Sequence, residues 1–320
     1  MLFVPVLAFV LSWCLLAILL RSGLAGRLAM DEPNHRSLHK VAIPRIGGLG
    51  ILAGTLACMT SLTPMLWLAA ALVCALGLLS FFDDRRGVPI LIRLSAHFVA
   101  AVIWVQSVHS WPPLLAILVA LLLVWMTNLY NFMDGADGLA GGMAITGFGA
   151  YGVAAGLGGQ AEFAWLCAAV VAASLGFLRF NFPPARLFMG DVGSIPLGFL
   201  AGALGLLGWD LGLWQVWFPA LVFSPFVVDA SLTLLRRMIE GKKFWLAHSE
   251  HYYQRLLRMG WSQRRMALAA YALMMASAAS ALWLERANPV LQLAILAGWG
   301  LVYAALAWRI DAAWREQETV

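Results

Sequence analysis

Polar side chains gather in the segment 128–142, NLYNFMDGADGLAGG, which follows the uninterrupted apolar run Leu114–Met126. Asn128, Asn131, Asp134 and Asp137 recur at every third position. On a helix this spacing keeps the four side chains on one broad face. Ionisable groups at membrane depth are costly and are usually functional where they occur. A polar seam between helices is the alternative, but so many carboxamides and carboxylates in register favour chemistry at a bilayer surface.

Two other sets of carboxylates stand next to apolar runs. Asp83 and Asp84 end one run and are followed by Arg93, and Asp191 stands just before another run, between Gly190 and Gly193. Mg²⁺ typically takes one or two carboxylates together with phosphate oxygens and water, so the paired aspartates are candidate metal ligands. The alternatives are a local Asp–Arg ion pair at a helix end and, for Asp191, a helix cap.

A long basic loop, 236–265, carries His248 and His251 three residues apart, and Arg255 four residues further on. On a helix these three side chains share a face, and imidazoles with a guanidinium suit a pyrophosphate. A zinc site is a weaker interpretation, because the spacing is not H-E-x-x-H. The remaining alternative is an amphipathic helix lying on anionic lipid.

The elements that must position these residues are membrane helices. Hydrophobic residues make up 62% of the chain and charged residues only 12%, which excludes an ordinary soluble domain. A helical span needs roughly 20 apolar residues. We therefore predict an all-α polytopic integral membrane protein, a single transmembrane domain over 1–320 with about eleven spans. They lie near 2–20, 46–63, 65–82, 94–109, 113–130, 139–157, 162–179, 194–209, 213–235, 266–284 and 290–309.

The distribution of Lys and Arg predicts the orientation of these spans. If the N-terminus is outside, the alternation places inside the C-terminal tail and the loops 21–45, 83–93, 131–138, 180–193 and 236–265. Of the 21 Lys and Arg residues, only Arg286 then falls outside. The positive-inside rule thus predicts a cytoplasmic C-terminus and an active site facing the cytoplasm. Orientation and anionic lipid explain the net charge of +5 without a nucleic-acid partner.

Carboxylates, asparagines and a His/Arg cluster on one membrane face predict metal-assisted phosphoryl transfer, in which positioning and charge neutralisation carry catalysis. The expected substrates are a soluble molecule from the inside and a lipid from the bilayer. An ion-coupled transporter is an alternative, but it should place its polar groups near mid-membrane. A prenyltransferase or CDP-alcohol phosphotransferase would need a second Asp-rich motif in another arrangement, which 128–138 does not fit.

These residues also resemble a known family, the polyprenyl-phosphate N-acetylhexosamine-1-phosphate transferases, over nearly the whole chain. The matching motifs are Asp31-x-Pro-Asn34-x-Arg36 with His39 and Pro44…Gly47-Gly48, Asp83-Asp84 with Arg93, Asn128-x-x-Asn131-Phe-x-Asp134-Gly-x-Asp137-Gly, Phe188-Met-Gly-Asp191-x-Gly-Ser, and His248-x-x-His251. The two-histidine form departs from the family's longer histidine motifs. It is similar to the branch that initiates O-antigen and capsule, and it argues against the peptidoglycan translocase.

The resemblance implies that a UDP-N-acetylhexosamine gives its sugar 1-phosphate to undecaprenyl phosphate in the bacterial cytoplasmic (inner) membrane. UMP leaves, Mg²⁺ or Mn²⁺ assists, and a surface glycan, such as the O-antigen of lipopolysaccharide, begins. The sugar, the polymer and the oligomeric state are left open, with a homodimer among the alternatives.

The resemblance also assigns roles to residues. Asp191 and Asp83 are implied as metal ligands, with Asp83 also the candidate base or phosphate-orienting carboxylate and Asp84 beside it. The implied substrate-binding residues are Asn131, Asp134 and Phe188 on the uridine side, Asp137 in the same pocket, His248, His251 and Arg255 at the phosphate or sugar, and Asn128 and Arg93.

Overall fold

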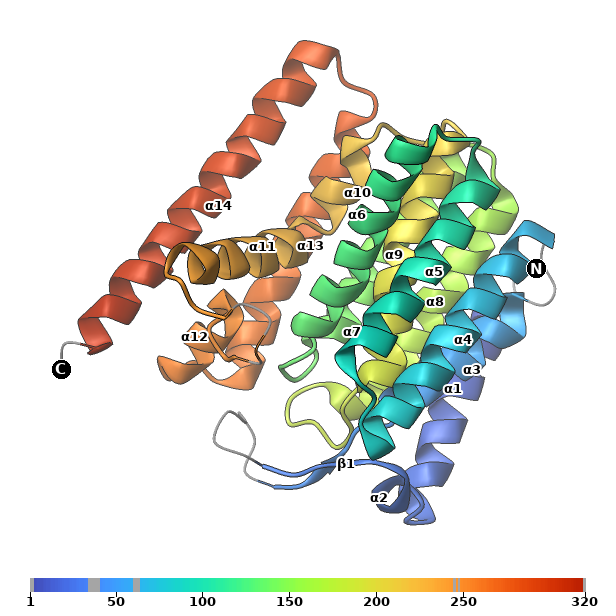
Figure 1. The fold of residues 1–320 in the computed structure, drawn as a ribbon, viewed down its shortest axis with the longest axis vertical. Coiled ribbons are helices and arrows are strands. Elements are labelled where there is room, and N and C mark those ends of the chain that lie inside the picture. Colours follow the sequence, from blue (N-terminus) through green and yellow to red (C-terminus); the bar gives the residue numbers. More distant parts are fainter. Residues whose placement is uncertain (1–2, 34–40, 60–63, 244–245, 247, 319–320) are drawn as a thin grey trace.

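The computed structural model describes residues 3–33, 41–59, 64–243, 246 and 248–318. Figure 1 shows these residues as a bundle of long helices with a few short elements at one end. The elements are α1 (Phe3–Arg21), α2 (Ala25–Leu28), β1 (Met30–Asp31), β2 (Ile43–Pro44), α3 (Gly47–Met59), α4 (Pro64–Arg86), α5 (Ile90–Val108), α6 (Pro113–Phe132), α7 (Leu139–Leu157), α8 (Ala161–Asn181), α9 (Asp191–Asp210), α10 (Trp217–Val222), α11 (Ser224–Ile239), α12 (Tyr252–Arg258), α13 (Gln263–Leu284) and α14 (Pro289–Glu318). The all-α prediction is confirmed, because the two antiparallel strands have only two residues each.

Within the described part of the chain, nine helices are long and apolar enough to cross a membrane, so this is a multi-pass membrane protein. They are α1, α4, α5, α6, α7, α8, α9, α13 and α14. Of the other two predicted spans, 46–63 corresponds to the shorter apolar helix α3, whose described part has 13 residues. The predicted count of about eleven thus rests on whether α3 and the region of α10 and α11 also cross.

The predicted span 213–235 is divided into α10 and α11. The division falls at Phe223, just before Pro225, whose missing N–H favours the first turn of a new helix over the interior of a continuous one. In Figure 1, α11 lies crosswise to α6 instead of continuing along the bundle. The one predicted span at 213–235 is therefore two helices in the structure.

The helix α9 is the centre of the bundle, and four-fifths of its span is buried. Small residues let its neighbours come close. A Cβ atom on Gly48 of α3 would lie 2.2 Å from the backbone nitrogen of Gly193, and one on Gly198 would lie 2.7 Å from the carbonyl oxygen of Thr127 on α6. Because only glycine tolerates such approach, the first turn of α9 is fixed against α3, and the helix further along against α6.

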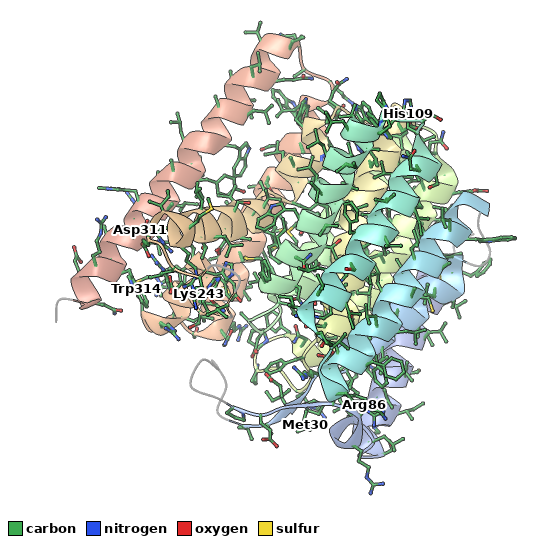
Figure 2. All side chains as sticks on the ribbon, viewed as in Figure 1. Met30, Arg86, His109, Lys243, Asp311 and Trp314 are labelled. Atoms are coloured by element: carbon green, nitrogen blue, oxygen red, sulfur yellow. The ribbon has the colours of Figure 1, made fainter. Side chains whose placement is uncertain are left out.

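Two of the loops predicted to be inside lie at one end of the bundle, and one loop predicted to be outside lies at the other. Figure 2 shows Met30 and Arg86, from loops predicted to be inside, at the end opposite His109, from a loop predicted to be outside. The candidate catalytic residues lie on the Arg86 side, since Asp83 is one turn before Arg86 on α4.

Candidate active site

A cavity of about 520 Å³ brings most of the predicted site residues together. Its polar lining comes from α4, α5, α6, α9 and the segment before and within α12: Ser80, Asp83, Arg93, His97, Asn128, Asn131, Asp191, His248, His251 and Gln254. The rest of the lining is mostly apolar and includes Leu121, Trp125 and Leu234. The cavity therefore joins a charged region to an apolar wall, as a site for a soluble and a lipid substrate would require.

Two carboxylates from distant parts of the sequence converge at this cavity. Arg93 contacts the Asp83 carboxylate, and the same guanidinium nitrogen lies 3.5 Å from Oδ2 of Asp191. Asp83 is further held by the backbone N–H of Val88, which donates to Oδ1 at 2.7 Å. A cationic group thus lies between two carboxylates whose oxygens face a common point.

The orientation of Asp191 is set by α6 and by the turn before α9. The side chain of Asn131 donates to Oδ1 of Asp191 at 2.8 Å, which leaves Oδ2 toward Arg93. The turn depends on Gly190, whose φ of +72° lies in the left-handed region and whose Cβ, if present, would lie 2.6 Å from the carbonyl oxygen of Arg45. The Gly-Asp pair in the sequence is therefore a geometric requirement at the start of this helix.

The chemistry of this donor set fits a hard divalent cation. Mg²⁺ commonly takes only one or two carboxylates and completes its shell with water and phosphate oxygens. Asp83 and Asp191 provide such a pair, although the described residues contain no group of three or more metal-ligating side chains. The two carboxylates would hold the ion and Arg93 would then be free to contact a phosphate.

Asp84, the other half of the carboxylate pair, lies outside the cavity. Its carboxylate is 3.5 Å from Nε of Arg45 and accepts the backbone N–H of Val192 at 3.4 Å. Arg45 also donates to the Asp84 carbonyl oxygen at 2.9 Å. Asp84 therefore fastens α4 to the start of α9, and it is Asp83 whose carboxylate faces the reaction space.

The cavity is also lined by His97, which belongs to none of the sequence motifs. Its Nδ1 lies 3.3 Å from the side-chain nitrogen of Asn128, and the imidazole is buried between α5 and α6. The sequence feature that could have identified His97 is its position four residues after Arg93. This spacing places both polar side chains on one face of an otherwise apolar helix.

The polar face expected to run through 128–137 is interrupted. The helix α6 ends at Phe132, so Asn128 and Asn131 line the cavity while Asp134 and Asp137 follow in a loop that ends at Gly138, with φ +75°. Asp137 is buried and accepts the backbone N–H of Ala185 at 2.9 Å. The prediction of one continuous helical face is therefore wrong for the two aspartates.

Asp134 lies near the carboxylate site without lining the cavity. Burial raises the pKa of Asp134 well above its usual value, and the carboxylates of Asp191 and Asp84 raise it further. The nearby backbone N–H of Gly190 opposes this effect. A cation or a hydrogen-bond donor bound at this point would lower that pKa, because it would favour the charged carboxylate.

Phe188 belongs to a loop that is held by backbone hydrogen bonds. Its N–H donates to the carbonyl oxygen of Pro44, and its carbonyl oxygen accepts from the N–H of Gly47, both at 2.8 Å. The side chain is half-buried outside the cavity. The motif residues Asn34, Arg36 and His39 lie outside the described residues.

His248 and His251 both line the cavity, but they do not lie on one helix face as predicted. Since α12 begins at Tyr252, His248 and His251 precede the helix instead of sharing its face. Their ring centroids are nevertheless 4.9 Å apart, and the His251 ring stacks on Phe132 with a centroid distance of 6.3 Å. The imidazoles thus form the wall that closes the cavity beside the end of α6.

His248 predicts a pH dependence of stability. Burial, with contributions from His251 and Arg237, lowers the pKa of His248 from 6.5 to about 4. Between these values the unfolded chain binds more protons than the folded one, so stability is lost as the pH falls. We expect the thermal midpoint of the protein in detergent to decrease between about pH 7 and about pH 5, and His248→Gln to reduce this slope. An unchanged slope in the variant would show that His248 is not the group responsible.

Arg255 lies away from the cavity. Its guanidinium donates to Oδ1 of Asp311 on α14 at 2.6 Å and stacks over the rings of Tyr252 and Trp314. Arg236 donates to the same oxygen at 2.7 Å. The structure therefore does not bring Arg255 to the two histidines, and instead links the loop that carries them to the C-terminal helix.

Because Arg255 and Asp311 form one ion pair, substitutions of either residue should lower the stability of the protein through the same contact. We expect Arg255→Gln and Asp311→Asn each to cost about 2 kcal/mol of stability, as loss of a charged hydrogen bond does, and the double variant to cost less than their sum. Thermal unfolding in detergent measures this, with Arg309→Gln on the same helix as a control that should change nothing. A raised KM in Arg255→Gln with an unaffected Asp311→Asn would instead place Arg255 at the substrate.

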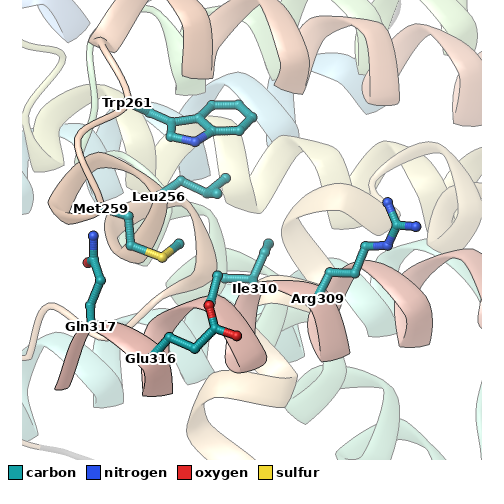
Figure 3. Close-up of a pocket in the computed structure, with 8 residues that line it drawn as sticks. Leu256, Met259, Trp261, Arg309, Ile310, Glu316 and Gln317 are labelled. Carbon is teal, nitrogen blue, oxygen red and sulfur yellow. The ribbon is translucent and has the colours of Figure 1, made fainter. Parts of the chain in front are cut away.

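Figure 3 shows a second cavity, of about 830 Å³, between α12 and the C-terminal part of α14. It is lined by Leu256, Met259, Trp261, Arg309, Ile310, Ala313, Glu316 and Gln317. None of the predicted catalytic or binding residues lies in it, so the first cavity is the candidate active site.

Comparison with known proteins places the chain in a family. Residues 65–208, which include Asp83, Arg93, Asn131 and Asp191, match the profile described as Glycosyl transferase family 4. A probable undecaprenyl-phosphate N-acetylglucosaminyl 1-phosphate transferase of Bacillus subtilis (strain 168) is 31% identical over 91% of this chain and 88% of its own length. An undecaprenyl-phosphate alpha-N-acetylglucosaminyl 1-phosphate transferase of Yersinia pestis is 28% identical over 89% of this chain and 85% of its own.

A different type of relative matches to a similar extent. A phospho-N-acetylmuramoyl-pentapeptide-transferase of Levilactobacillus brevis is 30% identical over 81% of this chain and 89% of its own length. The chain belongs to glycosyl transferase family 4, and it is a glycosyl-1-phosphate transferase.

Proposed function

We propose that the protein transfers an N-acetylhexosamine 1-phosphate from a UDP-sugar to undecaprenyl phosphate. A phosphate oxygen of the lipid attacks the phosphorus that carries the sugar, the bond from that phosphorus to the bridging oxygen of UMP breaks, and UMP leaves with the electron pair. The observation that carries this proposal is the convergence of Asp83 and Asp191 on either side of Arg93. Two carboxylates that can hold a divalent cation, together with a guanidinium, suit two phosphate-bearing substrates whose negative charges repel each other.

Each side of the cavity has a part in this reaction. Asp83 and Asp191 would hold Mg²⁺ or Mn²⁺, which when bound neutralises charge on the transferring phosphoryl group. Arg93 contacts phosphate oxygens, and Asn131 keeps Asp191 in position. The lipid phosphate is largely ionised near neutral pH, so the attacking oxygen needs no general base. The apolar lining around Leu121 and Trp125 receives the lipid chain.

We also propose that the site faces the cytoplasm at the bacterial inner membrane and that the reaction begins a surface glycan, O-antigen in particular. The Lys and Arg distribution supports the orientation. The two-histidine loop supports an O-antigen-initiating enzyme over a peptidoglycan one, although both kinds of relative are found.

A panel of UDP-sugars tests this proposal. Membranes containing the protein are given undecaprenyl phosphate and labelled UDP-N-acetylglucosamine, UDP-N-acetylfucosamine, UDP-N-acetylquinovosamine or UDP-N-acetylmuramoyl-pentapeptide. We expect labelled lipid from at least one simple N-acetylhexosamine and none from the pentapeptide derivative. Labelled lipid from the pentapeptide derivative alone would reverse the choice between the two branches.

A further inference from the structure

The carboxylate of Asp229 in α11 contacts a residue that lines the active-site cavity, and no sequence motif suggested this contact. It is buried, with 9% of the residue exposed, and accepts two successive backbone N–H groups at the start of α12. Tyr252 donates to Oδ1 at 2.9 Å, and Tyr253 donates to Oδ2 at 3.0 Å. Asp229 thus supplies from another helix the capping interaction that satisfies the free N–H groups of a helix N-terminus.

The same carboxylate meets the ring of His251. Its Oδ1 lies 3.2 Å from Nδ1 of the imidazole, and His251 lines the active-site cavity. A carboxylate can only accept, so the hydrogen of this bond is on Nδ1. Nε2 is then the ring nitrogen left for a ligand in the cavity.

Neighbouring rings and backbone fix the plane of that imidazole. The His251 ring stacks on the Phe132 ring, with a centroid distance of 6.3 Å and an interplanar angle of 26°, and on the Tyr253 ring, with 5.9 Å and 17°. The hydroxyl of Tyr253 donates to the carbonyl oxygen of Phe132 at 3.2 Å, which joins α12 to the end of α6. The Asp229 contact therefore acts on a ring that has little other freedom.

We propose that Asp229 is a positioning residue that holds His251 with its hydrogen on Nδ1 and presents Nε2 to the bound UDP-sugar. This rests on the proposed function for the identity of the ligand, but the state of the ring does not depend on it. Partners that orient an active-site imidazole in this way are typically worth 10- to 100-fold in activity where they orient metal ligands, and we expect about 10-fold here.

Nitrogen NMR tests whether the hydrogen of the His251 ring is on Nδ1. The protein is labelled with ¹⁵N-histidine and studied in lipid nanodiscs at a pH where the ring is neutral. His251→Gln identifies the resonances. We expect Nδ1 to be protonated and Nε2 unprotonated in the wild type, and Asp229→Asn to shift the ring toward the Nε2–H form. Thr233→Val is the matched control, because the Thr233 hydroxyl also donates to Oδ1 of Asp229, at 3.2 Å, without touching the ring. A wild-type ring protonated on Nε2 would overturn the proposal.

Kinetics test whether Asp229 affects the reaction through His251. Asp229→Asn should lower kcat/KM about 10-fold in the wild type but much less in a His251→Gln background, while Thr233→Val stays near the wild-type rate. Equal losses in both backgrounds, with the fold intact by thermal unfolding, would show that Asp229 acts only as a cap of α12. If no UDP-sugar is a substrate, the proposed function fails while the NMR result still decides the ring state.

Discussion

Asp191→Asn is expected to lower kcat by about 100-fold or more, the range found when one charge-stabilising group is removed from a preorganised site. The amide keeps the shape of the side chain and its contact with Asn131, but it removes the charge that faces Arg93 and a bound cation. We also expect the variant to need more Mg²⁺ for half-maximal activity. The measurement is the rate of lipid product formation as a function of Mg²⁺ concentration.

The matched control for this variant lies on the same helix. Asp210 is the last residue of α9, at the opposite end, where it pairs with His109 at 3.0 Å. Asp210→Asn makes the same chemical change far from the cavity and should leave both kcat and metal dependence near wild type. If Asp191→Asn retained full activity with normal metal dependence, Asp191 would not be the metal ligand.

Asp83→Asn should have an effect of similar size, and it should differ in kind from that of Asp84→Asn. Asp83 faces the cavity and Arg93, so its loss should lower kcat by about 100-fold and lower the thermal midpoint less than Asp84→Asn does. Asp84 joins Arg45 and the start of α9, so Asp84→Asn should chiefly lower the thermal midpoint.

The comparison of the two variants needs both kinetics and unfolding in the same detergent. Steady-state rates should separate them by at least about 10-fold, and the thermal midpoints should be ordered the other way. The reverse pattern, with Asp84→Asn inactive and stable while Asp83→Asn is active, would mean that Asp84 is the carboxylate that acts on the substrate.

The pattern of polar residues in the sequence predicted which types of residue form the site. It did not predict which helix or loop carries each of them. Asn128 and Asn131 could be paired because they share one helical turn. Asp134 and Asp137 could not be placed, because they lie in the loop after α6, whose path includes the left-handed backbone at Gly138 and the contact of Asp137 with the backbone of Ala185. A repeat of three in the sequence does not contain that information.

Tertiary contacts account for the other differences. The family resemblance implied Asp83 and Asp191 as metal ligands, but their convergence depends on how α4 and α9 pack. Arg255 followed the histidines in sequence, yet its partner Asp311 comes from α14, which hydropathy marks only as a span. Asp229 gave no motif because its partners lie on the separate helix α12.

The most direct test of the reaction is the fate of the β-phosphate of the sugar nucleotide. Purified protein in nanodiscs with undecaprenyl phosphate and Mg²⁺ is given UDP-N-acetylglucosamine, or the best sugar of the panel, labelled with ³²P at that phosphate. We predict that the label moves into the lipid and that one UMP is released for each labelled lipid. Transfer of the sugar with the label left behind in UDP would contradict the account, because the enzyme would then move a sugar and not a sugar 1-phosphate.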